Sequence, residues 1–213
     1  MIKNLIFDMG QVLIHWDPEQ IMYADGVTDK EDMALINKYM YHTSDWSLMD
    51  WGYVNEEKME KLAMERLPER LWYSVHKLLF GWYDHIYPME GMATLIKDYK
   101  EMGLNIYLLS NASSLLHEYF PHIPGSEYFT DKVVSADVKM IKPMHEIYEY
   151  AISKFDIKPE ESVFIDDLCA NVAAARLCGL HGYVFYPYPD QLRVYLDDLL
   201  AGKEDKTGFP IKR

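Results

Sequence analysis

The segment IKNLIFDMGQVLIHWD occupies residues 2–17, and within it the apolar run LIF (5–7) ends at Asp8 and is followed by Gly10. A short apolar run bounded by Asp and Gly is typical of a buried β-strand. Similar runs recur at 105–110 (NIYLLS), 132–135 (KVVS), 162–166 (SVFID) and 182–186 (GYVFY), and helical periods lie between them at 90–102, 144–155 and 169–178. This alternation predicts an α/β fold with a doubly wound, mostly parallel Rossmann-like sheet.

Residues 15–87 interrupt the alternation. A capping box beginning at Thr28 predicts a helix to about Tyr41, Asn55 is the expected cap of a second helix, and residues 71–86 predict a third. All five tryptophans of the chain lie in this insert. We therefore expect a core domain of residues 1–14 and 88–201, a helical cap domain of residues 15–87, and a polar tail of residues 202–213.

Charge and composition limit the partners of the chain. A formal net charge of −13 over 213 residues argues against a nucleic-acid surface, although a few local donors could still bind a small phosphorylated metabolite. No apolar run is long enough to span a membrane, and the N-terminus does not have the pattern of a signal peptide. Cys169 and Cys178 are predicted to be free, buried thiols, so the expected location is the cytoplasm, and the oligomeric state is left open.

Polar residues follow several of the predicted strands. Each of them could be an ordinary helix cap or turn residue, but in a parallel sheet the carboxyl ends of the strands meet at one edge, where ligands bind. The residues expected at this edge are Asp8, Ser110, Asn111, Lys142, Asp166 and Asp167.

This set of side chains suits phosphoryl transfer. Clustered carboxylates repel each other unless a cation joins them, and oxygen-only ligands with open positions suit Mg²⁺. Lys142 would add a compact positive charge, and Ser110 a hydroxyl at a strand-to-helix turn where backbone N–H groups face an anion. Asp8 could then attack phosphorus and form an aspartyl-phosphate.

At this point the residues resemble a known family. FDMGQVL (7–13), LLSNAS (108–113), IKP (141–143) and VFIDDLCAN (163–171) resemble, in order and spacing, the motifs of the haloacid dehalogenase (HAD) superfamily. The insert is similar to the type-1 cap of that superfamily. DMGQV looks like the version found in bacterial α-glucose-1-phosphate phosphatases, and IDDLCAN like the version in the phosphatase domain of soluble epoxide hydrolase.

The resemblance implies a role for each motif residue. Asp8 would be the nucleophile and a metal ligand, the Gly10 carbonyl a second ligand, and Asp167 the acidic ligand of the last motif. Asp166 would orient Lys142 or reach the metal through water, and Lys142 would stabilise Asp8 and the transferring group. Ser110 and the backbone near Asn111 would hold the phosphoryl oxygens. By their positions in the linker and the cap loops, Trp16, Trp46 and Trp51 could face the pocket, and Trp16 is expected to contact the substrate.

Gly10 departs from the pattern of most phosphatases in the family. They carry at this position a second Asp, which protonates the leaving group and later activates water, and such help is typically worth about 10²–10⁴-fold in rate. Three explanations remain open. The leaving group could be unusually acidic, as in a sugar 1-phosphate; Asp17 or His15 could substitute through water; or activity could have been lost.

The sequence thus predicts a Mg²⁺-dependent phosphatase that acts on a small phosphorylated metabolite, with a sugar phosphate favoured. One alternative is a 2-haloacid dehalogenase, in which Asp8 would attack carbon without metal. Such enzymes are expected to use an arginine of the cap, yet the first arginine of the chain is Arg66. The other alternative is a non-catalytic phosphosugar-binding or regulatory protein.

Overall fold

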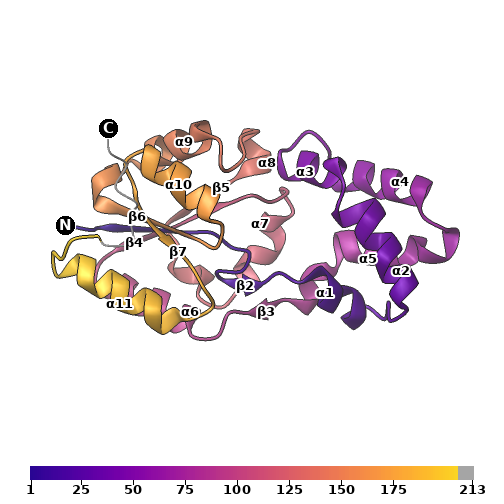
Figure 1. Cartoon of the computed structure of the whole chain (residues 1–213), viewed down its shortest axis with the longest axis horizontal. Helices are drawn as coiled ribbons and strands as arrows, with labels where there is room; N and C mark the ends of the chain where they lie inside the picture. The colour runs from indigo at the N-terminus through magenta and orange to yellow at the C-terminus, as the bar shows by residue number, and fades with distance from the viewer. Residues whose placement is uncertain (206–213) are drawn as a thin grey trace.

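The computed structural model describes residues 1–205 of the chain. An α/β core lies beside a separate group of helices, the cap, as Figure 1 shows. The core contains a five-stranded parallel sheet in the order β5-β4-β1-β6-β7. Its strands are β1 (Asn4–Phe7), β4 (Asn105–Ser110), β5 (Asp131–Val134), β6 (Ser162–Asp166) and β7 (His181–Val184). The predicted fold class is therefore confirmed, although the last strand ends at Val184 and not at residue 186.

Helices cover both faces of the sheet. Alternate residues of β1 explain the two layers, because Leu5 and Phe7 join one buried cluster and Ile6 joins the other. The helices α9 (His145–Phe155) and α10 (Cys169–Leu177) pack on the face of Ile6, and α6 (Met92–Glu101) and α11 (Pro189–Leu200) pack on the opposite face (Figure 1). Two one-turn helices, α7 (Leu116–Tyr119) and α8 (Ser135–Val138), follow β4 and β5.

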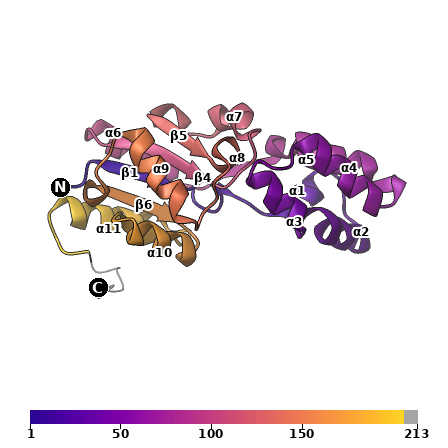
Figure 2. The same cartoon turned by 90° about the horizontal axis from the view of Figure 1, so that it is seen from above.

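The cap is made of short helices. They are α1 (Pro18–Ala24), α2 (Lys30–Ile36), α3 (Ser44–Asp50), α4 (Glu56–Arg66) and α5 (Trp72–Phe80). The chain enters and leaves the cap through β2 (Ile14–His15) and β3 (Tyr87–Pro88), which pair antiparallel. Figure 2 shows the cap extending from the end of the core at which β1 enters the cap linker.

Several boundaries differ from the predictions for local physical reasons. The side chain of Asp29 accepts the first N–H groups of α2, so Asp29 and not Thr28 is the cap, and α2 continues as a π-helical turn from Asn37 to Tyr41. The predicted helix at 71–86 ends at Phe80, because Gly81 follows and the chain continues as a 3₁₀ turn. Asn55 caps α4 as predicted, by accepting the N–H of Lys58.

Two further expectations concern the cysteines and the tail. Both cysteines are free, but the prediction that they are buried is wrong: Cys169 is exposed in the first turn of α10, and Cys178 is partly exposed at its end. Of the predicted tail, residues 206–213 lie outside the described residues. Within residues 1–205, no helix is both long and apolar enough to cross a membrane.

Candidate active site

Asp8 and Asp166 stand side by side because their strands are neighbours. Phe7 pairs with Ile165 in parallel register, and the N–H of Asp8 donates to the Ile165 carbonyl at 2.8 Å. The two acids therefore leave the same edge of the sheet, as expected for residues at the carboxyl ends of parallel strands.

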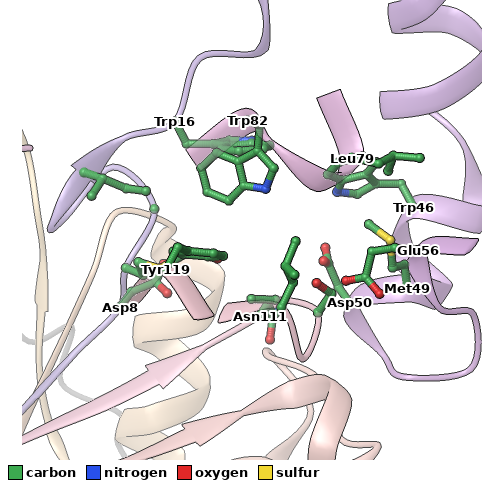
Figure 3. A pocket seen from close by; sticks show the side chains of 16 residues that line it. Asp8, Trp16, Trp46, Met49, Asp50, Glu56, Leu79, Trp82, Asn111 and Tyr119 are labelled. Atoms are coloured by element: carbon green, nitrogen blue, oxygen red, sulfur yellow. The ribbon is translucent and has the colours of Figure 1, made fainter. Parts of the chain in front are cut away.

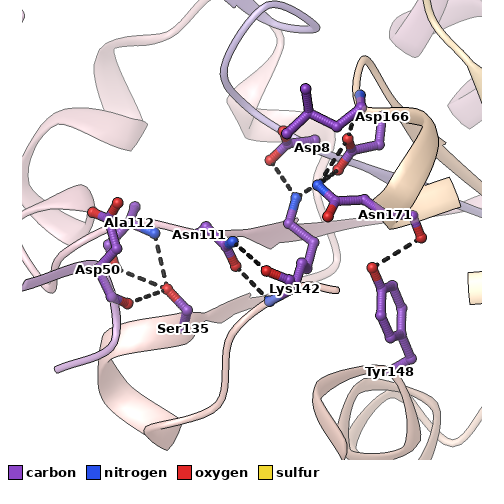
Figure 4. Close-up of polar contacts among 10 residues, drawn as sticks. Asp8, Asp50, Asn111, Ala112, Ser135, Lys142, Tyr148, Asp166 and Asn171 are labelled. Carbon is purple, nitrogen blue, oxygen red and sulfur yellow. Dashed lines mark hydrogen bonds and ion pairs between the residues drawn. The ribbon is translucent and has the colours of Figure 1, made fainter. Parts of the chain in front are cut away.

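Lys142 bridges these two acids. Its Nζ lies 2.8 Å from Asp8 Oδ1 and 2.7 Å from Asp166 Oδ2, and its side chain is only 1% exposed. Asn111 holds the backbone of Lys142 from both sides, since its Oδ1 accepts the Lys142 N–H at 2.9 Å and its Nδ2 donates to the Lys142 carbonyl at 3.0 Å. The loop after β4 thus fixes the position of the lysine (Figure 4).

Asp166 is the most fully bonded of the acids. Besides Lys142, it accepts the N–H of Leu168 at 2.8 Å and the Nδ2 of Asn171 at 3.0 Å to each oxygen. The hydroxyl of Tyr148 donates to the Asn171 carbonyl at 2.9 Å and so braces the start of α10 (Figure 4). Donors already occupy both oxygens of Asp166, which makes it the group that positions Lys142.

Burial and the neighbouring charges shift the pKa values of Asp8 and Lys142. Burial is the largest effect on Asp8, and together with the nearby Asp166 it raises the pKa of Asp8 to about 7, although Lys142 opposes this. Burial lowers the pKa of Lys142, but the two carboxylates outweigh it and the pKa is raised overall. Lys142 is therefore protonated at neutral pH, and its charge keeps a large share of Asp8 ionised.

The third acid completes a cluster suited to a divalent cation. Carboxylate oxygens of Asp8, Asp166 and Asp167 all lie within 4.8 Å of one another. Burial, followed by the charge of Asp166, raises the pKa of Asp167, so a cation placed here would relieve the repulsion. An all-oxygen set of this kind fits Mg²⁺, and Asp8 and Asp167 offer oxygens that Lys142 and Asn171 do not already occupy.

A cavity of about 130 Å³ lies between Asp8 and the cap. Figure 3 shows Asp8 at one end and tryptophans of the cap and its linker along the opposite wall. The lining residues are Asp8, Met9, Gly10, Ile14, Trp16, Trp46, Met49, Asp50, Glu56, Leu79, Trp82, Asn111, Ala112, Ser113, Leu115 and Tyr119.

The predicted site residues take different places around this cavity. Asp8, Gly10, Trp16 and Asn111 line it. Lys142 and Asp166 are buried and do not line the cavity themselves. The ion pair between Lys142 and Asp8 connects them to it. Ser110 ends β4 with 1% exposure and is not part of the wall.

The two residues suggested as substitutes for the missing acid do not reach the cavity. Asp17 accepts the N–H groups of Glu19 and Gln20 and so caps α1, and His15 lies exposed in β2. The position of these two side chains therefore lends no support to that explanation for Gly10.

Sequence reasoning missed three polar residues of the wall. Tyr119 comes from α7 in the core, and Asp50 and Glu56 come from α3 and α4 in the cap. None of them lies in a motif. Tyr119 reaches the cavity from within the core, and only the docking of the cap on the core brings Asp50 and Glu56 there.

Comparison with known proteins identifies the family of this chain. A haloacid dehalogenase-like hydrolase family model matches residues 2–179, and the chain belongs to this family. A sesquiterpene phosphatase of Aspergillus oryzae is 26% identical over 183 residues, covering 84% of this chain and 88% of that protein. A D-ribitol-5-phosphate phosphatase of Bacteroides thetaiotaomicron is 22% identical over 196 residues, covering 86% and 91%.

A solved structure supports the same fold. A HAD-family enzyme of Bacteroides thetaiotaomicron, in complex with magnesium and inorganic phosphate, superposes with a TM-score of 0.66 at 21% identity, covering 92% of this chain and all of that one. The chain is thus a HAD-like hydrolase with phosphatase relatives and an acidic cluster suited to Mg²⁺.

Proposed function

We propose that this protein is a Mg²⁺-dependent phosphatase that hydrolyses a small phosphorylated metabolite through an aspartyl-phosphate on Asp8. The observation that carries the proposal is the position of Asp8, which lies at the end of a cavity between core and cap, in an ion pair with Lys142 and next to Asp167. Lys142 favours the ionised, nucleophilic form of Asp8, and its ion pair occupies Oδ1.

The proposed reaction has two displacements at phosphorus. A carboxylate oxygen of Asp8 attacks, the ester P–O bond breaks, and the leaving alkoxide takes a proton from water. A water molecule then attacks the same phosphorus, the acyl-phosphate P–O bond breaks, and Asp8 returns as a carboxylate with inorganic phosphate released. Mg²⁺ held by Asp8 and Asp167 would supply positive charge against the phosphoryl oxygens.

The remaining side chains act by charge and position. The ammonium of Lys142 neutralises Asp8 before attack and faces the negative charge that develops during transfer. Asp166 and Asn171 hold that ammonium in place, and Asn111 fixes the loop that carries it. Sugar and polyol phosphates are the first compounds to assay, since one relative is named a D-ribitol-5-phosphate phosphatase.

The test is phosphate release from a panel of phosphate monoesters, with and without Mg²⁺. We expect release that needs Mg²⁺ and falls to background in Asp8→Asn, with Asp17→Asn as the matched control because Asp17 caps α1 outside the cavity. Activity that survives chelation or Asp8→Asn would refute the mechanism. Equal rates for sugar 1-phosphates and 6-phosphates would exclude an acidic leaving group as the reason for Gly10.

The dehalogenase alternative meets an electrostatic objection. A 2-haloacid carries its own carboxylate, and among the described residues no arginine, lysine or histidine lines the cavity, whereas Asp50 and Glu56 do. Binding of Mg²⁺ and phosphate analogues without any phosphate release would instead support the non-catalytic alternative.

A further inference from the structure

A second pair of acids lies in the cavity, away from the phosphoryl site. Asp50 is the last residue of α3 and Glu56 the first of α4, and Figure 3 shows both across the cavity from Asp8. The charge of Glu56 acts on Asp50, whereas the main charges that act on Asp8 are those of Lys142 and Asp166. The pair therefore faces the part of a substrate that points away from phosphorus, which is the leaving group.

The structure holds this pair firmly in position. The Oγ of Ser135 in the core donates to the Asp50 carbonyl and accepts the N–H of Ala112 at 2.9 Å (Figure 4). Next to it, Gly52 packs so closely on Ala136 that a Cβ at this glycine would lie 2.1 Å from the Ala136 carbonyl oxygen. The backbone of the cap at Asp50 is thus fixed relative to the loop that carries Asn111.

The described part of the protein does not fully satisfy this pair of acids with donors of its own. The Oε1 of Glu56 is buried and accepts no hydrogen bond from residues 1–205. Burial, followed by the charge of Glu56, raises the pKa of Asp50 to about 8, so Asp50 holds a proton at neutral pH in the ligand-free protein. A cationic ligand beside both acids would replace that proton and supply the missing partner of Glu56.

The rest of the wall suits a cation as well. The rings of Trp16 and Trp82 meet edge to face with centroids 4.7 Å apart, Trp82 meets Tyr119 in the same way at 4.7 Å, and Trp46 lies 6.1 Å from Trp16. These four aromatic residues line the same cavity as the acids. Aromatic faces attract ammonium groups, and most strongly where water is excluded.

The cavity has room for a small leaving group. Its volume of about 130 Å³ is close to that of the ~150 Å³ cavity that accepts benzene. A leaving group of a few non-hydrogen atoms therefore fits beside the two acids.

We propose that Asp50 and Glu56 bind an ammonium group on the substrate, and that the preferred substrates are phosphate monoesters of small amino alcohols. This inference rests on the proposed phosphatase function and names its substrate class. An ammonium group donates up to three hydrogen bonds and supplies a positive charge beside the pair, whereas a hydroxyl supplies no charge and an alkyl chain supplies neither a charge nor a hydrogen bond.

The experiment compares three phosphate esters of equal length with Mg²⁺ present: 2-aminoethyl, 2-hydroxyethyl and propyl phosphate. A hydrogen bond to a charged group contributes more free energy than one between neutral groups. We therefore expect kcat/KM for the aminoethyl ester to be about tenfold or more higher than for the other two esters. Glu56→Gln and Asp50→Asn should each remove most of this preference by lowering kcat/KM for the aminoethyl ester alone. Glu57→Gln is the matched control, because Glu57 lies in the same first turn of α4 but is exposed.

A binding measurement separates this inference from the proposed function. Calorimetric titration of the Asp8→Asn variant with the three esters should give the tightest binding for 2-aminoethyl phosphate, and adding Glu56→Gln should remove the difference. That result supports the ammonium site even if no ester is hydrolysed. Equal or tighter binding of the neutral esters, no binding of any of them, or a preference that survives both acid substitutions would overturn it.

Discussion

Replacing Lys142 by methionine tests the electrostatic centre of the site. The substitution keeps the length of the side chain and removes a charge that pairs with Asp8 at 2.8 Å and with Asp166 at 2.7 Å. Both acids are buried, with side chains 12% and 0% exposed, so water cannot replace the lysine. Removing one partner of a buried ion pair typically destabilises a protein by about 3–5 kcal/mol.

We expect a loss of this size in the free energy of unfolding at pH 7.5, measured by urea denaturation without Mg²⁺. For a chain of this length each kcal/mol shifts Tm by about 2–4 °C, so the melting temperature should fall by about 6–20 °C. Lys3→Met is the matched control. Lys3 pairs with Glu161 at 2.8 Å but is 59% exposed, and such a surface pair contributes about 0–1 kcal/mol.

The pH dependence of this loss makes the prediction specific. Without Lys142 the pKa of Asp8, already raised to about 7 by burial, should rise further, because the charge that lowers it is gone. At pH 5 the proton can neutralise Asp8, so Lys142→Met should cost less there than at pH 7.5. A loss below about 1 kcal/mol at pH 7.5, or a larger loss at pH 5, would refute this account of the site.

Three further predictions follow from the same geometry. Gly10→Asp should raise phosphate release from alkyl phosphates by up to about 10²-fold in a steady-state assay; an unchanged rate in a folded variant would show that proton transfer is not limiting. Asp50→Asn should flatten the dependence of the unfolding free energy on pH. Because the pKa of Asp50 is raised from 3.8 to about 8, the folded wild type holds a proton that the unfolded chain releases. The unfolding free energy of the wild type should therefore fall as pH rises through that range, by up to about 1.4 kcal/mol per pH unit. Mg²⁺ at 100 times its Kd should stabilise the wild type by about 2.7 kcal/mol in thermal melts, and Asp167→Asn should lose this shift; an equal shift in both would exclude Asp167 as a ligand.

The sheet could be predicted from the sequence because its signal is local. Each central strand is a short apolar run closed by a polar residue, and parallel pairing then places the ends of all strands at one edge. The helices α9 and α10 have clear apolar periods and were found within about one or two residues. By contrast, α3 is only seven residues long, too short for a periodic pattern, and it packs against α4 of the cap and α8 of the core.

The cap side of the site could not be predicted because it depends on docking. Asp50 and Glu56 are unremarkable acids at the ends of two cap helices in the sequence. They reach the cavity because Gly52, with φ +78°, lets the cap approach Ala136 closely, and because Ser135 bonds the Asp50 carbonyl. The same docking leaves Asp17 and His15 outside, although both lie nearer to Asp8 in sequence.

The structure changes the explanation for the glycine at position 10. As a residue after a strand it looked like a turn former, but the left-handed backbone conformation in this turn belongs to Gln11, at φ 56°. Gly10 itself does not have a positive φ, and a Cβ there would meet only the Cβ of Trp16, at 3.8 Å. Backbone geometry therefore does not require glycine at this position. Because Gly10 lines the cavity beside Trp16, its missing side chain leaves room between the nucleophile and the aromatic wall, and the choice of glycine is best explained by the shape of the leaving group.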